Sequence, residues 1–199
     1  MTLGIVLPAA GASSRMRGRD KLLEEVDGMP LLLRQVRRAL STGLPLLVTL
    51  PPEPGARAAC LGDVTDAAFE ARRVPDAANG ISASLRAAAH WALERDMSGL
   101  MIVLPDMPDL TGEDMRAVGA LHAEHPRDVI RATDAQGRFG HPTLLPARLL
   151  PALVTLRGDT GAREVIARER VRPCPLGGTR ATLDLDTPEA WADWRTAKD

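Results

Sequence analysis

The chain has 199 residues, of which 45% are apolar and 26% charged, a composition typical of a soluble globular protein. This length suffices for one α/β domain with a sizeable core, so we predict a single domain over residues 1–199. The formal net charge of −1 excludes a general attraction to nucleic acid or to an anionic membrane. Aromatic residues are only 3% and tyrosine is absent, which argues against a surface that stacks single-stranded bases.

The cysteines and the first residues bear on the expected location. Cys60 and Cys174 have no zinc-binding spacing and do not indicate a disulfide framework. The first residues lack the basic segment and long apolar run of a signal peptide. No stretch approaches the ~18 consecutive apolar residues of a membrane span. We therefore expect a cytoplasmic protein without a membrane partner.

The first half of the chain alternates predicted strands and helices. A short apolar run at residues 3–7 predicts a buried strand, and apolar residues at helical spacing predict a helix around residues 32–40. A second buried strand is predicted at residues 46–50, where two prolines end it. Residues 53–70 are weakly patterned and are predicted to form a short helix and a loop.

A helix over residues 85–93 follows, with Ser82 or Ser84 as its expected N-cap. The clearest buried strand is residues 100–104, which ends at Pro105 and Asp106. A further helix is predicted to begin at Thr111 as its N-cap. Strands that alternate with helices in this way predict an α/β fold with three layers and a mostly parallel sheet.

The last third of the sequence is less regular. A short strand is predicted at residues 129–130, and two short helices near 147–154 and 161–168. The remaining expected elements are a Gly/Pro-punctuated hairpin at residues 137–146, a final strand near 182–185 and a closing helix at 188–196. We interpret residues 137–180 as an insertion that covers one edge of the sheet.

The loop after the first strand is a candidate phosphate site. Its small residues between positions 8 and 16 let the backbone approach a ligand, and successive N–H groups can hold an anion. Four basic residues lie within seven positions: Arg15, Arg17, Arg19 and Lys21. The loop lacks the Lys-Ser/Thr ending of a P-loop and the three-glycine spacing of a dinucleotide fingerprint. It therefore predicts another type of phosphate site, with a plain strand–loop connection as the alternative.

Several blocks of the sequence resemble the motifs of one enzyme family. The first loop contains Ala9-Ala10-Gly11, then Ser13-Ser14-Arg15-Met16 and Lys21-Leu22-Leu23. Five further blocks follow in order, at residues 79–85, 104–108, 140–142, 158–163 and 184–188. Together they resemble the molybdenum cofactor nucleotidyltransferases, most closely the cytidylyltransferases among them. The resemblance implies a nucleotide-diphospho-sugar transferase-like fold, which is Rossmann-like.

Two departures from the family pattern concern the first loop. Pro8 stands where the family has a leucine, which changes nothing chemical. Residues 17–20 make the loop a residue or two longer than its commonest form, which leaves the positions of Arg17 and Arg19 open.

The resemblance implies two segments that bind a nucleoside triphosphate. The residues it assigns to the nucleotide are Ala9, Ala10, Gly11, Ser14, Arg15 and Lys21 in the first loop, and Asn79, Gly80 and Ser82 in the second. Arg15 and Lys21 are expected to stabilise charge on the transferred and leaving phosphates, as catalytic residues. Ser82 and the backbone near it are expected to approach the base or the ribose.

Acidic residues predict a Mg²⁺ site. Asp106 follows the clearest strand, where open α/β sheets bind ligands, and Mg²⁺ prefers one or two carboxylates with phosphate oxygens. The alternative is that Asp106 and Asp109 cap the helix at Thr111. The resemblance implies a second ligand from Asp184 or Asp186. Because alternate residues of a strand point to opposite faces, we expect only one to face the metal, with Asp184 favoured and Asp186 capping the closing helix.

The acceptor side is assigned by the same resemblance. His141, Asp159 and Arg163 are expected to line it, whereas a turn and a capped helix start are the alternative interpretation of these residues. No Ser-His-Asp or Cys-His arrangement is recognisable in the sequence. A phosphate acceptor has a second pKa near ~6 and is largely ionised at neutral pH, so no general base is needed.

The expected reaction is the Mg²⁺-dependent transfer of a nucleotide to the phosphate of molybdopterin, with release of pyrophosphate. Alternatives are a cytidylyltransferase of the same fold acting on methylerythritol phosphate or a sugar phosphate, and a non-catalytic molybdopterin carrier. A molybdoenzyme or its chaperone is a possible protein partner. Guanine-transferring relatives have a loop resembling Ala-Gly-Gly, so the methyl group of Ala10 would narrow the space beside the base and favour CTP over GTP.

Overall fold

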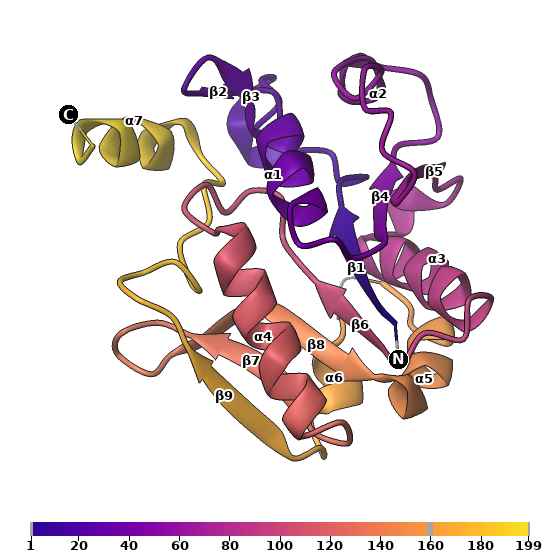
Figure 1. The fold of residues 1–199 in the computed structure, drawn as a ribbon. Helices are drawn as coiled ribbons and strands as arrows, with labels where there is room; N and C mark the ends of the chain where they lie inside the picture. Colours follow the sequence, from indigo (N-terminus) through magenta and orange to yellow (C-terminus); the bar gives the residue numbers. More distant parts are fainter. Residues whose placement is uncertain (1, 159–160, 199) are drawn as a thin grey trace.

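The computed structural model describes residues 2–158 and 161–198. Its centre is a seven-stranded sheet with the strand order β5-β4-β1-β6-β8-β7-β9 (Figure 1). The strands are β1 (Leu3–Pro8), β4 (Leu46–Leu50), β5 (Phe69–Arg73), β6 (Gly99–Ile102), β7 (Val129–Thr133), β8 (Phe139–Pro146) and β9 (Val171–Pro175). Only β8 runs against its neighbours, because it pairs antiparallel with both β6 and β7 while the other pairs are parallel. The α/β class and the mostly parallel sheet predicted from the sequence are confirmed.

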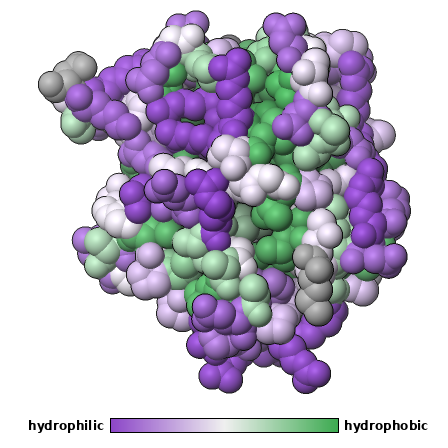
Figure 2. Space-filling view, in the orientation of Figure 1, coloured by the Kyte–Doolittle hydropathy of each residue, from purple (hydrophilic) through white to green (hydrophobic). Residues whose placement is uncertain are grey.

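Helices cover both faces of the sheet. They are α1 (Leu31–Leu40), α2 (Ala56–Ala59), α3 (Ile81–Leu93), α4 (Gly112–Glu124), α5 (Leu150–Val154), α6 (Arg163–Ile166) and α7 (Pro188–Thr196). Apolar residues of α1 and α4 pack on one face of the sheet, and those of α3 and α5 pack on the other. The predicted three layers are therefore present. On the surface seen in Figure 2, hydrophobic residues lie mainly in a band near the middle of the view.

Alternation along each central strand explains the two-sided core. In β1, Ile5 and Leu7 belong to the cluster under α1 and α4, whereas Val6 belongs to the cluster under α3. These three side chains are fully buried, as are Leu100 and Met101 of β6. Strands that are covered on both faces have nearly continuous apolar sequences, and for this reason β1, β4 and β6 were recognisable in the sequence.

The stretch interpreted as an insertion instead extends the sheet. β8 and β9 add to it at the side opposite β5, with β7 between them. Three other expectations were also wrong. β5 replaces part of a predicted loop, β6 ends at Ile102 rather than at residue 104, and residues 182–185 form no strand.

The helix ends confirm one predicted cap and correct two. Thr111 caps α4 through a reciprocal capping box with Asp114. The N-cap of α3 is Gly80, so neither Ser82 nor Ser84 caps that helix. The side chain of Thr187 accepts from the amide of Ala190 and caps α7, a role expected of Asp186.

A small hairpin and the closing helix complete the fold. The hairpin strands β2 (Glu25–Val26) and β3 (Met29–Pro30) lie just before α1. Val26 shares a buried cluster with Trp191 and Trp194 of α7, which holds the C-terminal helix beside the hairpin (Figure 1). Among the described residues, no helix has the length and apolar character needed to cross a membrane.

Candidate active site

A cavity of about 600 Å³ opens at the carboxyl ends of β1 and β6. From β1 the chain first builds β4 and β5 on one side, and then returns to place β6 on the other. Ligands of open α/β sheets bind outside such a switch point. Five segments contribute to its wall: the loop after β1, Arg57 of α2, the residues from Ala77 to Ser84 around the start of α3, Leu104 to Asp106 after β6, and the loop with Asp184 and Asp186.

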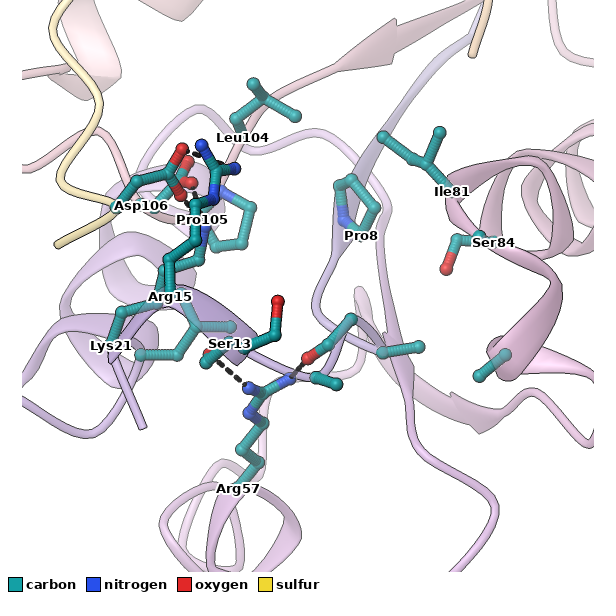
Figure 3. Close-up of a pocket in the computed structure, with 18 of the residues that line it drawn as sticks. Pro8, Ser13, Arg15, Lys21, Arg57, Ile81, Ser84, Leu104, Pro105 and Asp106 are labelled. Atoms are coloured by element: carbon teal, nitrogen blue, oxygen red, sulfur yellow. Dashed lines mark hydrogen bonds and ion pairs between the residues drawn. The ribbon is translucent and has the colours of Figure 1, made fainter. Parts of the chain in front are cut away.

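The first loop brings its predicted residues into this wall. Ala10, Gly11, Ser14, Arg15 and Lys21 all line the cavity, whereas Ala9 is fully buried in the core and does not line it. Figure 3 shows the loop below the cavity, with Lys21 and Asp106 on one side and Ile81 and Ser84 on the other. The loop residues expected to meet a nucleotide therefore gather at one place.

Not all of the basic residues in this loop face the cavity. Arg17 pairs with Glu189 at 2.6 Å, and Arg19 pairs with Glu24 at 3.4 Å. Neither of these two arginines lines the cavity, whereas Arg15 and Lys21 do. The positions of Arg17 and Arg19, which the longer loop had left open, are therefore outside the cavity.

Lys21 lies between two carboxylates that come from distant parts of the chain. Its Nζ donates to Asp106 Oδ2 at 2.5 Å and to Asp186 Oδ1 at 2.6 Å. Burial alone would lower the pKa of Lys21, but the attraction of Asp106 and the hydrogen bonds to both carboxylates outweigh it and raise that pKa. Lys21 therefore stays positively charged in this position.

Asp186 has a second cationic partner. Arg15 Nη2 lies 2.7 Å from Asp186 Oδ2, although 69% of the Arg15 side chain is exposed. Burial would raise the pKa of Asp186, but hydrogen bonding and attraction to Lys21, followed by the attraction of Arg15, lower it. Asp184 differs, because burial and then repulsion by Asp186 and Asp106 raise its pKa.

Three carboxylates meet at the cavity wall. Asp106, Asp184 and Asp186 each offer an oxygen, and these oxygens all lie within 4.8 Å of one another. The expectation that only one of the two C-terminal acids faces this point was wrong, because residues 182–185 form no strand and the alternation does not apply. Asp106 Oδ1 is buried and, within the described chain, has no hydrogen-bond partner. An oxygen-rich cluster with an unpaired buried carboxylate oxygen fits a hard divalent cation such as Mg²⁺.

Helix α1 holds the segment that carries Asp106. Arg34 and Arg38 both donate to the carbonyl of Pro108, at 2.8 and 2.7 Å, and Gln35 donates to the carbonyl of Met107. These bonds fix the backbone just after Asp106. Asp109 instead accepts from Trp194 and Lys198 of the C-terminal region, and Thr111 caps α4, so the alternative in which Asp106 and Asp109 cap this helix was wrong.

The loop that carries Asp184 and Asp186 is held by two backbone contacts. The amide of Leu185 donates to the carbonyl of Asp106 at 3.1 Å, and the amide of His141 donates to that of Ala181 at 2.8 Å. Gly140 allows this approach, since a Cβ there would lie 1.7 Å from the Ala181 carbonyl oxygen. The Gly140-His141 motif thus places the acidic loop.

The second predicted nucleotide segment needs one correction. Gly80 lines the main cavity, and Asn79 lines a neighbouring one. Ser82 is fully buried within α3, where it donates to the carbonyl of Asn79 and accepts from Arg86, and it does not line the main cavity. Ile81 and Ser84 of the first turn of α3 line it instead, although Ser84 is only 3% exposed.

A second cavity of about 510 Å³ adjoins the first, and Ile81 and Leu104 line both. Two of the predicted acceptor residues, His141 and Arg163, line this second cavity. Asp159 lies outside the described residues. Burial lowers the pKa of His141, whose Nδ1 donates to the carbonyl of Ile102 at 3.2 Å, so the imidazole is neutral near pH 7.

Three side chains of these cavities that could bind a charged or aromatic group were not predicted from the sequence. Arg57 of α2 lines the main cavity, and Arg131 and Phe139 line the second one. The Arg131 guanidinium lies 5.1 Å from the centre of the Phe139 ring, which is 46% exposed. Arg57 had no recognisable signal because it lies in a weakly patterned stretch, and Phe139 could have been noticed as one of only two phenylalanines.

Both the sequence and the fold have matches among known proteins. The family model of the MobA-like NTP transferase domain matches residues 4–173. The purine catabolism protein PucB of Bacillus subtilis (strain 168) is 26% identical over 203 residues, which cover 95% of this chain and 93% of PucB. Rv0371c from Mycobacterium tuberculosis H37Rv has a crystal structure that matches with a TM-score of 0.78 at 25% identity, over 100% of both chains.

Two further structures share the fold. A structure of Rv0371c described as a complex with manganese has a TM-score of 0.72 at 24% identity, over 96% of each chain. CMP:2-keto-3-deoxy-manno-octonic acid synthetase complexed with CTP has a TM-score of 0.76 at 13% identity, covering 100% of this chain and 98% of that one. The chain thus belongs to the MobA-like NTP transferase domain family and is a nucleotidyltransferase.

Proposed function

We propose that this enzyme transfers CMP from CTP to the terminal phosphate of molybdopterin, with Mg²⁺ as its metal ion. An oxygen of the acceptor phosphate attacks the α-phosphorus of CTP, a new P–O–P linkage forms, and the bond to the β-phosphate breaks to release pyrophosphate. The observation that carries the proposal is the pair of adjoining cavities, one with three carboxylates, Lys21 and Arg15, and the other with two arginines.

The first cavity supplies what phosphoryl transfer requires. Such reactions depend on positioning and on charge stabilisation rather than on covalent chemistry by the protein. Lys21 and Arg15 offset negative charge on the transferred and leaving phosphates, and the backbone of the first loop binds them. Asp106, Asp184 and Asp186 would hold Mg²⁺, which supplies Lewis-acid stabilisation of the phosphate oxygens when bound.

The second cavity suits an acceptor that combines a phosphate with a planar ring. Burial, and then repulsion by Arg163, lower the pKa of Arg131, and Arg131 Nε is buried without a partner in the described part of the chain. An anionic group between Arg131 and Arg163 would offset their repulsion and accept a hydrogen bond from Arg131 Nε. The half-exposed Phe139 ring offers a face for a flat heterocycle such as a pterin.

The choice of CTP follows from Ala10. Its side chain packs against Val74 and Ala83 and is 8% exposed where it meets the cavity wall. A methyl group at that point reduces the room available to a purine more than to a pyrimidine. GTP is the alternative nucleotide, and a molybdoenzyme or its chaperone would be the recipient of the product.

A panel of substrates tests the proposal. CTP, GTP, ATP and UTP would each be mixed with MgCl₂ and either molybdopterin, methylerythritol phosphate or a sugar phosphate, and pyrophosphate release would be measured. We expect release above background with CTP and molybdopterin. If only methylerythritol phosphate or a sugar phosphate supports turnover, that compound and not molybdopterin is the acceptor. Binding of molybdopterin without any pyrophosphate release would favour the carrier function.

A further inference from the structure

Arg57 lies on the far side of the first loop from the acidic cluster (Figure 3). It comes from α2, and only 7% of the residue is exposed. Its Nε donates to Asp20 Oδ2 at 2.7 Å, and one terminal nitrogen donates to the carbonyls of Ala9 and Gly11, both at 2.6 Å. The other terminal nitrogen donates to Ser13 Oγ and Asp20 Oδ1, both at 2.8 Å.

These contacts occupy the whole guanidinium group. An arginine side chain has five N–H donors, and the five bonds of Arg57 use all of them. Arg57 therefore has no donor left for a ligand, although it lines the cavity. A direct phosphate contact of the kind expected from Arg15 or Lys21 is not available to it in this arrangement.

The two carbonyl contacts fix the direction of the amides that follow them. In a trans peptide the N–H group points opposite to the carbonyl. Because Arg57 holds the carbonyls of Ala9 and Gly11 on its own side, the N–H groups of Ala10 and Ala12 point away from Arg57, and both residues line the cavity. Within residues 2–158 and 161–198, neither N–H has a hydrogen-bond acceptor.

The contact with Asp20 fixes the other end of the loop. The Asp20 carboxylate binds Arg57 through both oxygens and also accepts from the amide of Leu22 at 3.0 Å. Lys21 lies between these two residues and reaches the acidic cluster. One arginine thus connects the amides near Ala10 to the lysine that pairs with Asp106.

We propose that Arg57 is a positioning residue that aims the Ala10 and Ala12 amides at the phosphates of the nucleotide. A preorganised pair of N–H groups binds an anion without the cost of ordering the loop at the moment of binding. The inference rests on the proposed function in one respect, namely that a polyphosphate occupies the cavity. It assigns a role to a residue that touches neither the nucleotide nor the acceptor.

The test uses Arg57→Lys, which keeps the charge but has three donors where five are needed. Binding of inorganic triphosphate with MgCl₂ would be measured by calorimetry, and kcat and KM for CTP by pyrophosphate release. We expect triphosphate affinity to fall by about tenfold or more and the KM for CTP to rise by a similar factor, with a smaller change in kcat. Arg73→Lys in β5 is the matched control, since Arg73 is exposed and donates to the carbonyl of Pro52 rather than to the loop.

The outcomes separate the two proposals. If the wild-type protein fails to bind triphosphate, the proposed function is wrong, and Arg57 has no phosphates to position. If the wild type binds it and a folded Arg57→Lys variant binds equally well, the role of Arg57 is overturned. Should Arg57→Lys fail to fold, Asp20→Asn removes the charged partner of the same guanidinium. An unchanged triphosphate affinity in folded Asp20→Asn would likewise overturn the inference.

Discussion

Lys21 Nζ lies 2.5 Å from Asp106 Oδ2, although the two residues are 85 positions apart in the chain. This ion pair joins the loop after β1 to the end of β6, the two segments that form the floor and one side of the cavity. Both side chains are largely shielded from water, with 19% and 10% exposed. Removing either side chain leaves the charge of the other incompletely compensated where water is largely excluded. The pair therefore affects the stability of the site as well as its chemistry.

The acidic cluster predicts that both C-terminal acids matter for the metal. Asp184→Asn and Asp186→Asn should each raise the Mg²⁺ concentration needed for half-maximal rate by about tenfold or more, since each removes a charged oxygen from the cluster. The rate would be measured against MgCl₂, and Mn²⁺ binding followed by electron paramagnetic resonance.

The exposed Asp193 on α7 provides the matched control, and Asp193→Asn should leave the Mg²⁺ requirement unchanged. A normal requirement in Asp186→Asn with only a lower melting temperature would restore the structural role first expected for that residue.

Ala10 provides a test of base selection. The wild type should prefer CTP over GTP by roughly ten- to a hundredfold in kcat/KM, which corresponds to a clash of about 1–3 kcal/mol. Ala10→Gly should reduce this ratio without improving CTP use. Because the methyl group also packs against Val74 and Ala83, the variant should lose some stability as well. An equal use of both nucleotides by the wild type would move selectivity to another segment, and the residues around Gly80 are the next candidates.

Asp134 predicts a pH-dependent contribution to stability. Burial would raise its pKa, but hydrogen bonds from the Arg138 amide, Thr182, the Arg138 side chain and the Gln136 amide lower it to about 2. The folded state therefore favours the ionised carboxylate, and this contribution is complete above the unfolded pKa of about 3.9. It is lost as the pH falls through about 2.

Asp134→Asn should accordingly be less stable than the wild type at pH 7, and the difference should shrink between about pH 4 and pH 2. Urea unfolding of both proteins across this range measures it, with the exposed Asp63→Asn as control. A difference that stays constant down to pH 2 would contradict the role of the carboxylate. Thr182 also leads into the acidic loop, so a weaker Mg²⁺ affinity in Asp134→Asn is a second readout.

The elements predictable from the sequence were those with two buried faces or clear caps. β1, β4 and β6 have nearly continuous apolar runs, and α4 begins at the capping residue Thr111. Within the seven-stranded sheet, the strands that were missed, β5 and β9, form the two edges. An edge strand tolerates charges and prolines: Phe69–Arg73 contains three charged residues, and Val171–Pro175 contains an arginine and two prolines.

The candidate site was predictable only where motifs carried it. The phosphate loop, Asp106 and the Gly140-His141 motif could be found along the sequence, and the structure brings them together. Arg57 could not, because its partner Asp20 lies 37 positions away and nothing local marks the contact. The orientation of Asp184 and Asp186 was predicted wrongly because the strand rule was applied to residues that form a loop.

The most direct test of the account follows the α-phosphate itself. CTP labelled at the α-phosphorus would be incubated with molybdopterin, MgCl₂ and the wild-type protein, or its Lys21→Ala or Asp106→Ala variant. The account predicts that label enters a pterin dinucleotide in step with pyrophosphate release, and that each variant loses ~10² in rate, or about 3 kcal/mol, while circular dichroism stays unchanged. Near-normal label transfer by either folded variant, or no transfer by the wild type with any nucleotide, would contradict it.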